Sequence, residues 1–307
     1  MTLDPAVADY LARVAADIPP LAETTPAARR TRMELVNRRF PAPEDAVARG
    51  DAYIALPGRE IAVRLYRPRA GTLPGIVYLH GGGWVAGSLA THDGTCAALA
   101  SDADALVASV HYRRAPESPY PAPNNDAYAA LAWLAQHAGA LGIDAARIGI
   151  GGDSAGAHLA LGCAIEARDR RGPPLALQLL VYPVVEPAFE TPSYHANANS
   201  PTLTRADMIW YWSQYLPQGS DDGGARAVPM RDTLAGLPPA HIVVAGLDPL
   251  HDEGVALADR LRAAGVGATL VEAPTLVHGF LRAAPYAAAA RAAQQALGAA
   301  ARAILHR

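Results

Sequence analysis

Lysine is absent from this sequence of 307 residues, so the 26 basic residues are all arginine. Nucleotide-binding sites of the Walker type hold the phosphates with a lysine, and this class of site is therefore excluded. The basic residues are also outnumbered by 29 acidic ones, which gives a formal net charge of −3. Because binding to DNA or RNA usually requires a basic surface, we expect no nucleic-acid partner.

Cysteines and long apolar runs are also scarce. The only cysteines are Cys96 and Cys163, and no group of cysteines and histidines has the spacing of a zinc site. We therefore expect two reduced thiols, no metal and a cytoplasmic protein. The most apolar stretch, residues 283–305, is interrupted by arginine and glutamine, so no membrane-spanning segment is expected. The first residues carry Asp4 and Asp9 and no positive charge, unlike a secretory signal.

Apolar residues make up 51% of the chain and charged residues 18%, which is typical of a folded globular protein. Within residues 1–45, Asp4 and Thr25 each precede a proline, and each pair predicts the start of a helix. The segments 51–56 and 61–66 flank a proline-glycine pair, which predicts two strands joined by a tight turn.

After these segments, short apolar stretches alternate with helical ones. The expected strands are 75–80, 106–112, 147–151, 175–182, 241–245 and 268–271. The expected helices are 91–101, 125–137, 155–170, 253–264 and a terminal helix. This alternation predicts an α/β fold with a mostly parallel sheet of about eight strands, covered by helices on both faces. The last strand, near 268–271, could pair at the sheet edge with its copy in a homodimer.

Residues 191–222 interrupt the alternation with a cluster of aromatic side chains, after a helix start expected at Ser200-Pro201. Such an insertion often forms a lid, and an extra helix packed on the core is the alternative. We favour a lid that is completed by the N-terminal helices. The expected organisation is a single domain, 1–307, with a helical cap of about 1–45 and 188–222 on a catalytic core of 46–187 and 223–307.

The segment Gly152–Gly156, with the sequence GDSAG, lies where an expected strand ends and a helix begins. A dinucleotide-binding pattern does not fit, because its frame from Gly149 places Ser154 where the third glycine should be. The pattern G-x-S-x-G fits instead, and it predicts a sharp turn that lifts Ser154 above the sheet as a nucleophile.

A second motif, HGGGW, occupies residues 80–84 after another expected strand. Three glycines allow the backbone N–H groups of Gly82 and Gly83 to point into a pocket. Together with the N–H of Ala155 at a helix start, they could stabilise the negative charge that acyl transfer develops on a carbonyl oxygen. We assign a structural role to His80, whose ring can tie the loop to its neighbours.

A serine nucleophile needs a base, and the base needs an orienting acid. In this class of site the chain order is serine, acid, histidine. Of the histidines late in the chain, His251 follows the acid too closely and His306 lies on the last helical turn. His278 lies in a loop after the last expected strand and is therefore the candidate base.

The candidate acid is Asp248, just beyond the end of the strand 241–245, where α/β sheets place their sites. Asp252 and Glu253 fall at the start of the next helix, and we assign them to helix capping and to complementing the helix dipole. Asp153 precedes Ser154 in the chain, which is the wrong order for the acid, and is expected to make a supporting hydrogen bond.

These motifs resemble the hormone-sensitive-lipase-like family of α/β hydrolases, in its microbial carboxylesterase branch. The resemblance is carried by HGGGW at 80–84, GDSAG at 152–156, DPLHDEG at 248–254 and HGF at 278–280. The stretch YRRAPE at 112–117 is similar to the family's YRLAPE. Two residues depart from the family pattern, Arg114 in place of leucine and His251 in place of arginine.

The resemblance implies an α/β-hydrolase fold and hydrolysis of small carboxylic esters with short to medium acyl chains, without cofactor or metal. The side chains expected to contact the substrate are Trp84, Met208, Trp210 and Trp212, with Met33 and Phe40 beside them. The same catalytic groups would also serve an amide, a lactone or a formamide. A binding protein without catalysis is disfavoured, because such proteins tend to lose a member of the triad.

Overall fold

The computed structural model describes residues 2–21, 23–216 and 226–307. Within them, eight strands form one sheet in the order β1-β2-β4-β3-β5-β6-β7-β8. β2 pairs antiparallel with β1 and β4, and all other neighbours are parallel. The expected number of strands and their mostly parallel arrangement are confirmed. The strands are β1 Ala48–Leu56, β2 Arg59–Arg67, β3 Leu73–Leu79, β4 Leu106–Val110, β5 Ile143–Asp153, β6 Leu177–Val181, β7 Ala240–Leu247 and β8 Ala268–Val277.

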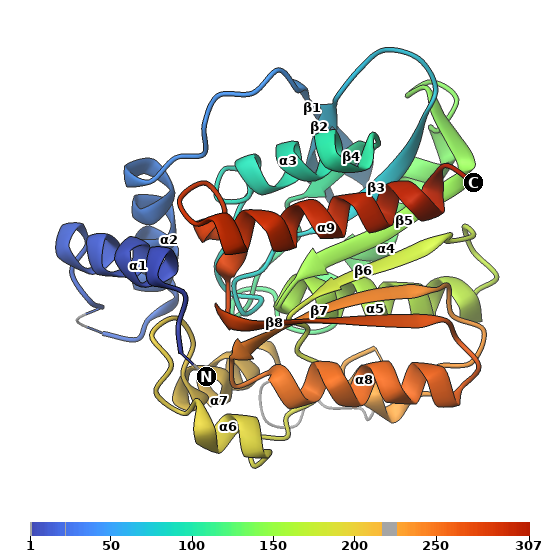
Figure 1. The fold of residues 1–307 in the computed structure, drawn as a ribbon. Helices are drawn as coiled ribbons and strands as arrows, with labels where there is room; N and C mark the ends of the chain where they lie inside the picture. The colour runs from blue at the N-terminus through green and yellow to red at the C-terminus, as the bar shows by residue number, and fades with distance from the viewer. Residues whose placement is uncertain (1, 22, 217–225) are drawn as a thin grey trace.

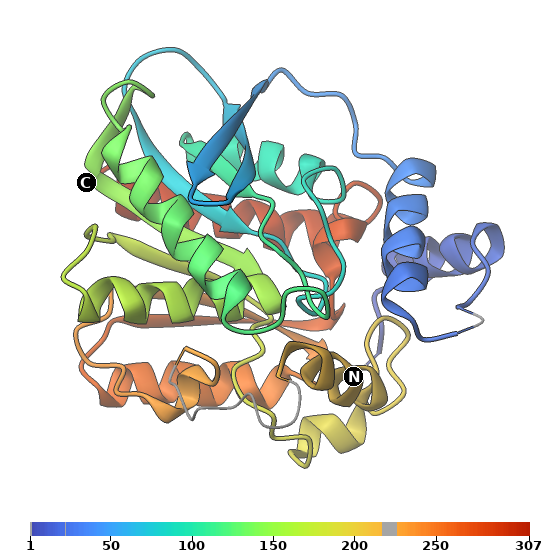
Figure 2. The same ribbon diagram turned by 180° about the vertical axis from the view of Figure 1, so that it is seen from behind.

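Helices cover both faces of the sheet, with α3 and α9 in front in Figure 1 and α4 and α5 in front in Figure 2. Each face has its own core, and β3 contributes to both. Val77 and Leu79 pack with α4 and α5, whereas Ile76 and Tyr78 pack with α3 and α9. The helices are α1 Pro5–Asp17, α2 Pro26–Arg39, α3 Asp93–Ala103, α4 Ala122–Gln136, α5 Ala155–Asp169, α6 Pro192–Ala196, α7 Arg205–Tyr215, α8 His251–Ala263 and α9 Ala288–Leu305, with short 3-10 helices η1 Pro229–Arg231 and η2 Phe280–Ala283.

The two N-terminal helices begin where the sequence predicted. The Asp4 carboxylate accepts hydrogen bonds from the first backbone N–H groups of α1, and the Thr25 hydroxyl does the same for α2. The start of α7 was placed wrongly at Ser200-Pro201. Thr204 caps this helix instead, in a reciprocal pair of hydrogen bonds with Asp207. This capping box satisfies two backbone N–H groups, which a serine-proline pair four residues earlier cannot do.

The last strand, β8, is longer than the expected 268–271. Pairing with β7 continues from Ala268 to Ala273 and resumes at Val277. The apolar pattern stops early because β8 is an edge strand whose side chains are mostly not buried. Among the described residues no strand pairs with its outer edge, although the N–H of Asp4 donates to the carbonyl of Thr275 at 2.9 Å, and pairing with a second copy stays a prediction.

Four helices gather at the end of the sheet to which the arrowheads of the parallel strands point. Figure 1 shows α1 and α2 beside α6 and α7 at this end. The final residues of the expected cap, 217–222, lie outside the described residues. None of the described helices combines the length and hydrophobicity needed to cross a lipid bilayer.

Candidate active site

Ser154 occupies the sharp turn between β5 and α5. Its backbone angles are φ 56° and ψ −120°, which residues with side chains rarely adopt. A Cβ atom at Gly156 would lie 1.8 Å from the carbonyl oxygen of Leu79, and one at Gly152 would lie 2.3 Å from it. Both positions require glycine, because only then can the turn pack closely against β3 and raise the serine above the sheet.

The structure brings together Ser154, Asp248 and His278, which follow the carboxyl ends of β5, β7 and β8. His278 Nε2 lies 2.9 Å from Ser154 Oγ, and His278 Nδ1 lies 2.7 Å from Asp248 Oδ2. The exposed fractions are 7% for the serine, 6% for the histidine and 0% for the aspartate. This geometry allows Nδ1–H to donate to the carboxylate while Nε2 accepts from the hydroxyl group.

The Asp248 carboxylate is held by more than the histidine. Its second oxygen accepts a hydrogen bond from the backbone N–H of Leu250 at 2.9 Å. Asn197 donates to the backbone carbonyl of Asp248 at 3.3 Å, and Ser200 donates to that of Leu247 at 3.1 Å. The segment around α6 therefore supports the loop that carries the acid.

The loop after β3 bends through two glycines with positive φ, 126° at Gly82 and 61° at Gly83. Within the described ranges, the N–H groups of Gly82, Gly83 and Ala155 donate to no protein acceptor. Ala155 is also the first residue of α5, where the helix dipole favours negative charge. Three free donors at one site can bind an oxyanion.

Asp153 joins this loop to the turn that bears Ser154. One carboxylate oxygen accepts from the N–H of Gly81 at 3.0 Å and from the Tyr78 hydroxyl at 2.9 Å. Burial acts to raise the pKa of Asp153, but His92, 3.4 Å away, the charge of Arg282 and the hydrogen bond from Tyr78 outweigh it, so the pKa is lowered. The expected supporting hydrogen bond is present, and it holds an ionised carboxylate behind the site.

His80 lies beneath the same loop and is fully buried. Its ring stacks on Tyr112, with 4.3 Å between the ring centroids. Burial and the nearby His92 lower its pKa well below the ordinary value, which favours a neutral ring. This placement agrees with a structural role. Although several histidines gather here, no group in the described part of the chain is arranged to bind a metal ion.

Asp252 and Glu253 lie in the first turn of α8, as expected for residues that complement the helix dipole, but the expectation that they cap the helix is wrong. Leu250 is the N-terminal cap position of α8, and no side chain caps it. Asp252 accepts from the N–H of Ser193 at 2.8 Å. Glu253 is buried and accepts from the N–H of Val185 at 2.7 Å and from a tyrosine hydroxyl. Asp252 therefore binds α6, and Glu253 binds both α6 and the segment that precedes it, because the start of α8 packs against them.

The predicted substrate-contacting side chains pack mainly among themselves. Trp84 is fully buried and stacks on Tyr215 of α7, with 4.3 Å between centroids. Met208 and Trp212 are buried in the same core, whereas Trp210 is half-buried. Trp84 therefore anchors α7 to the loop after β3, and contact of these side chains with a substrate remains a prediction.

Two residues near the site, Arg29 and Arg282, gave no signal in the sequence. Arg29 of α2 forms an ion pair with Asp207 and donates to the Tyr211 hydroxyl at 3.1 Å. The Tyr211 ring lies so close to Gly83 that a Cβ atom there would overlap it. Arg29 belongs to an arginine-rich stretch that is typical of a solvated helix face, and Arg282 lies on an unremarkable turn after His278.

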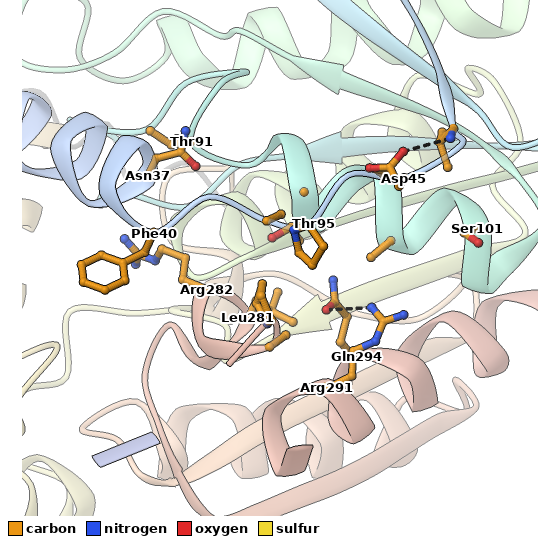
Figure 3. A pocket seen from close by; sticks show the side chains of 18 of the residues that line it. Asn37, Phe40, Asp45, Thr91, Thr95, Ser101, Leu281, Arg282, Arg291 and Gln294 are labelled. Carbon is orange, nitrogen blue, oxygen red and sulfur yellow. Dashed lines mark hydrogen bonds between the residues drawn. The ribbon is translucent and has the colours of Figure 1, made fainter. Parts of the chain in front are cut away.

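A cavity of about 480 Å³ opens beside η2 and is shown in Figure 3. Met33 and Phe40 line it, together with Leu281 and Arg282. None of the α7 residues expected to share a pocket with Met33 and Phe40 is among the described lining residues. This cavity lies toward α3 and α9, so a pocket shared by Met33, Phe40 and α7 stays a prediction.

Comparison with known proteins gives independent evidence about the family and activity of this chain. A protein family described by the α/β-hydrolase fold matches residues 76–282. The carboxylesterase NlhH of Mycobacterium tuberculosis is 44% identical over 246 residues, which cover 78% of this chain and 76% of NlhH. An ethyl acetate hydrolase of Pseudomonas putida is 39% identical over 231 residues, 73% of each chain.

Solved structures agree with the sequence relatives. A hyperthermophilic esterase of Pyrobaculum calidifontis superposes with a TM-score of 0.90 at 35% identity, over 99% of both chains. The motifs, the sheet and these relatives agree with the resemblance found in the sequence. The chain therefore belongs to the hormone-sensitive-lipase-like carboxylesterases of the α/β-hydrolase family and is a carboxylic ester hydrolase.

Proposed function

We propose that this enzyme hydrolyses short- to medium-chain esters through an acyl-enzyme on Ser154. Asp248 and His278 complete the triad, and Gly82, Gly83 and Ala155 form the oxyanion hole. The observation that carries this proposal is a pair of hydrogen-bond contacts. The Asp248 carboxylate lies 2.7 Å from the His278 imidazole, and the imidazole lies 2.9 Å from the Ser154 hydroxyl.

Acylation begins when His278 Nε2 accepts the Ser154 proton and Oγ attacks the ester carbonyl carbon. The carbonyl oxygen becomes an oxyanion that accepts from the three free N–H groups, and Asp248 stabilises the imidazolium through Nδ1. As the C–O bond breaks, His278 gives its proton to the leaving alcohol. The acyl group remains on Ser154, and the alcohol departs.

Deacylation repeats these steps with water as the nucleophile. His278 accepts a proton from water, the hydroxide oxygen attacks the acyl carbon, and the oxyanion forms in the same place. Collapse breaks the bond to Ser154 Oγ, which regains its proton from His278. The products are a carboxylic acid and the restored serine.

The acyl-chain preference is assigned to the cap, about 1–45 and 188–222, because the catalytic groups treat all esters alike. Each methylene of the acyl chain that is buried contributes about 0.8 kcal/mol to binding. The bulky indole rings of α7 should limit how many methylenes the pocket can hold. We therefore expect an optimum between roughly two and eight acyl carbons. The ethyl acetate hydrolase among the relatives supports the short end of this range.

A chain-length series of aryl esters tests the proposal with wild type and Ser154→Ala. Wild type should show the stated optimum, and Ser154→Ala should lose kcat by about 10³-fold or more. An organophosphate should label Ser154 and abolish turnover in proportion to labelling. Full activity of Ser154→Ala, or inactivating label on another residue, would disprove the acyl-enzyme at this serine.

A further inference from the structure

The cavity beside η2 contains an arginine whose guanidinium forms no ion pair within the described residues, although its charge acts on the buried carboxylate of Asp153 and lowers the pKa of that group. Arg282 lines it and is half-buried. Its guanidinium makes neither a hydrogen bond nor an ion pair with any residue in 2–21, 23–216 or 226–307. Other charged side chains of the cavity are compensated, since Asp45 pairs with Arg49 at 2.7 Å and Arg291 lies 3.7 Å from Asp102. The exposed Glu44 lies on the rim.

The guanidinium also lies beside Gly279, the residue that follows the catalytic histidine. Arg282 follows His278 on the same turn, and its Nη2 atom is 2.9 Å from where a Cβ atom of Gly279 would be. Burial raises the pKa of Tyr182, whose ring packs on His278 with 4.6 Å between centroids, and the charge of Arg282 opposes this rise. The charge therefore acts close to the reaction centre.

The remaining walls of the cavity define the ligand that would fit it. Met33, Val36, Phe40 and Leu281 supply apolar surface, and in the view of Figure 3 Phe40 and Arg282 lie at the same end. The Asn37 amide adds a donor that is unpaired among the described residues. A site with apolar walls, one free guanidinium and a neutral donor suits an apolar chain that ends in a carboxylate, which arginine binds through two parallel hydrogen bonds.

We propose that Arg282 binds a free carboxylate on the substrate, so that the enzyme favours esters that carry a second, ionised acid group. This inference rests on the proposed esterase activity, and it adds the class of ester. A single guanidinium matches the charge of one carboxylate, whereas a phosphate dianion would leave a negative charge uncompensated in a half-buried place.

The test compares monoethyl esters of dicarboxylic acids with ethyl esters of alkanoic acids that have the same number of carbons, from four to eight. The rate of ethanol release gives kcat/KM for each ester. Within a pair, the ratio of kcat/KM for the monoester to kcat/KM for the alkanoate ester measures the contribution of the free carboxylate. At the best length, Arg282→Met should lower this ratio about tenfold, the effect of one charge-assisted hydrogen bond. Arg282→Lys, which keeps the charge but not the planar fork, should retain part of it.

Arg302→Met is the matched control, because Arg302 is exposed on α9 and its loss changes the net charge equally. Its ratio should equal that of wild type. An unchanged ratio in Arg282→Met, or an equal loss for both members of every pair, would overturn the proposal. If wild type cleaved neither ester, the proposed function would fail. Calorimetric binding of monoethyl adipate to Ser154→Ala, with and without Arg282→Met, would then decide the inference separately.

Discussion

At the scale of single residues, the chemistry depends on which carboxylate reaches His278. Asp248 and Asp252 lie four positions apart, but only Asp248 contacts the imidazole, at 2.7 Å. Asp252 instead accepts from the backbone N–H of Ser193 in α6 at 2.8 Å and lies beside His251 at 3.0 Å. Asp248 lies in the loop before α8 and is buried against the histidine, whereas Asp252 lies in the first turn of α8 and connects this helix to α6.

Replacing Asp248 with asparagine should therefore lower kcat by up to about 10⁴-fold, because an amide favours the wrong imidazole tautomer and cannot stabilise the imidazolium. Asp252→Asn should reduce stability by about 1 kcal/mol and kcat by no more than a few-fold. Steady-state kinetics and thermal unfolding of the two variants measure this contrast. Similar losses of kcat in both would show that the acid is wrongly assigned.

At the scale of elements, two contacts hold α7 against the loop after β3. Tyr211 lies on Gly83, and Trp84 stacks on Tyr215. Arg29 of α2 secures this arrangement through Asp207 and through both Trp210 and Tyr211, whose ring centroids lie 4.9 Å and 4.7 Å from its guanidinium carbon. The N-terminal helix α2 thus reaches the catalytic loop through one arginine.

Arg29→Met should loosen this contact and leave the Asp207 carboxylate without its partner. We expect a lower melting temperature and a roughly fivefold to tenfold loss of kcat/KM, since the loop would be less preorganised. Arg38→Met, an exposed position on the same helix, controls for lost charge. If the two variants had the same kinetics and the same melting temperature, α2 would have no part in ordering the loop.

At the scale of the whole molecule, a buried carboxylic acid makes stability depend on pH. Burial raises the pKa of Glu253 to about 8, although its hydrogen bonds to Val185 and Tyr194 act in the opposite direction. In the unfolded chain this group ionises near its ordinary value, about 4.3. The protonated carboxyl group of Glu253 therefore contributes fully to the free energy of unfolding below its pKa in the unfolded chain. This contribution is lost as the pH rises through about 8.

Glu253→Gln cannot ionise, so its melting temperature should fall less steeply than that of wild type between pH 5 and 9. Differential scanning fluorimetry over this range measures the two slopes. Glu60→Gln, at an exposed position on β2, should keep the wild-type slope. A slope in Glu253→Gln as steep as in wild type would mean that another group controls the decline.

Short motifs made much of this protein predictable. The turn at Ser154 and the glycine loop after β3 depend on neighbours in the chain, so their sequences specify their backbone. The strands were found because burial on both faces requires continuous apolar segments. The order of strands and helices then indicated that Asp248 and His278 would lie at the same edge of the sheet as the serine.

By itself, the sequence determined the fold class, the order of the elements and the residues proposed for the triad, because each depends on local pattern or chain order. Only the tertiary structure decided that Glu253 is buried, that Trp84 and Trp212 anchor α7, and that Arg282 lines a cavity. These properties depend on surfaces that meet across long stretches of chain. The sequence can predict that a helix position is exposed or caps the helix. The actual environment of its side chain depends on which other element packs against it.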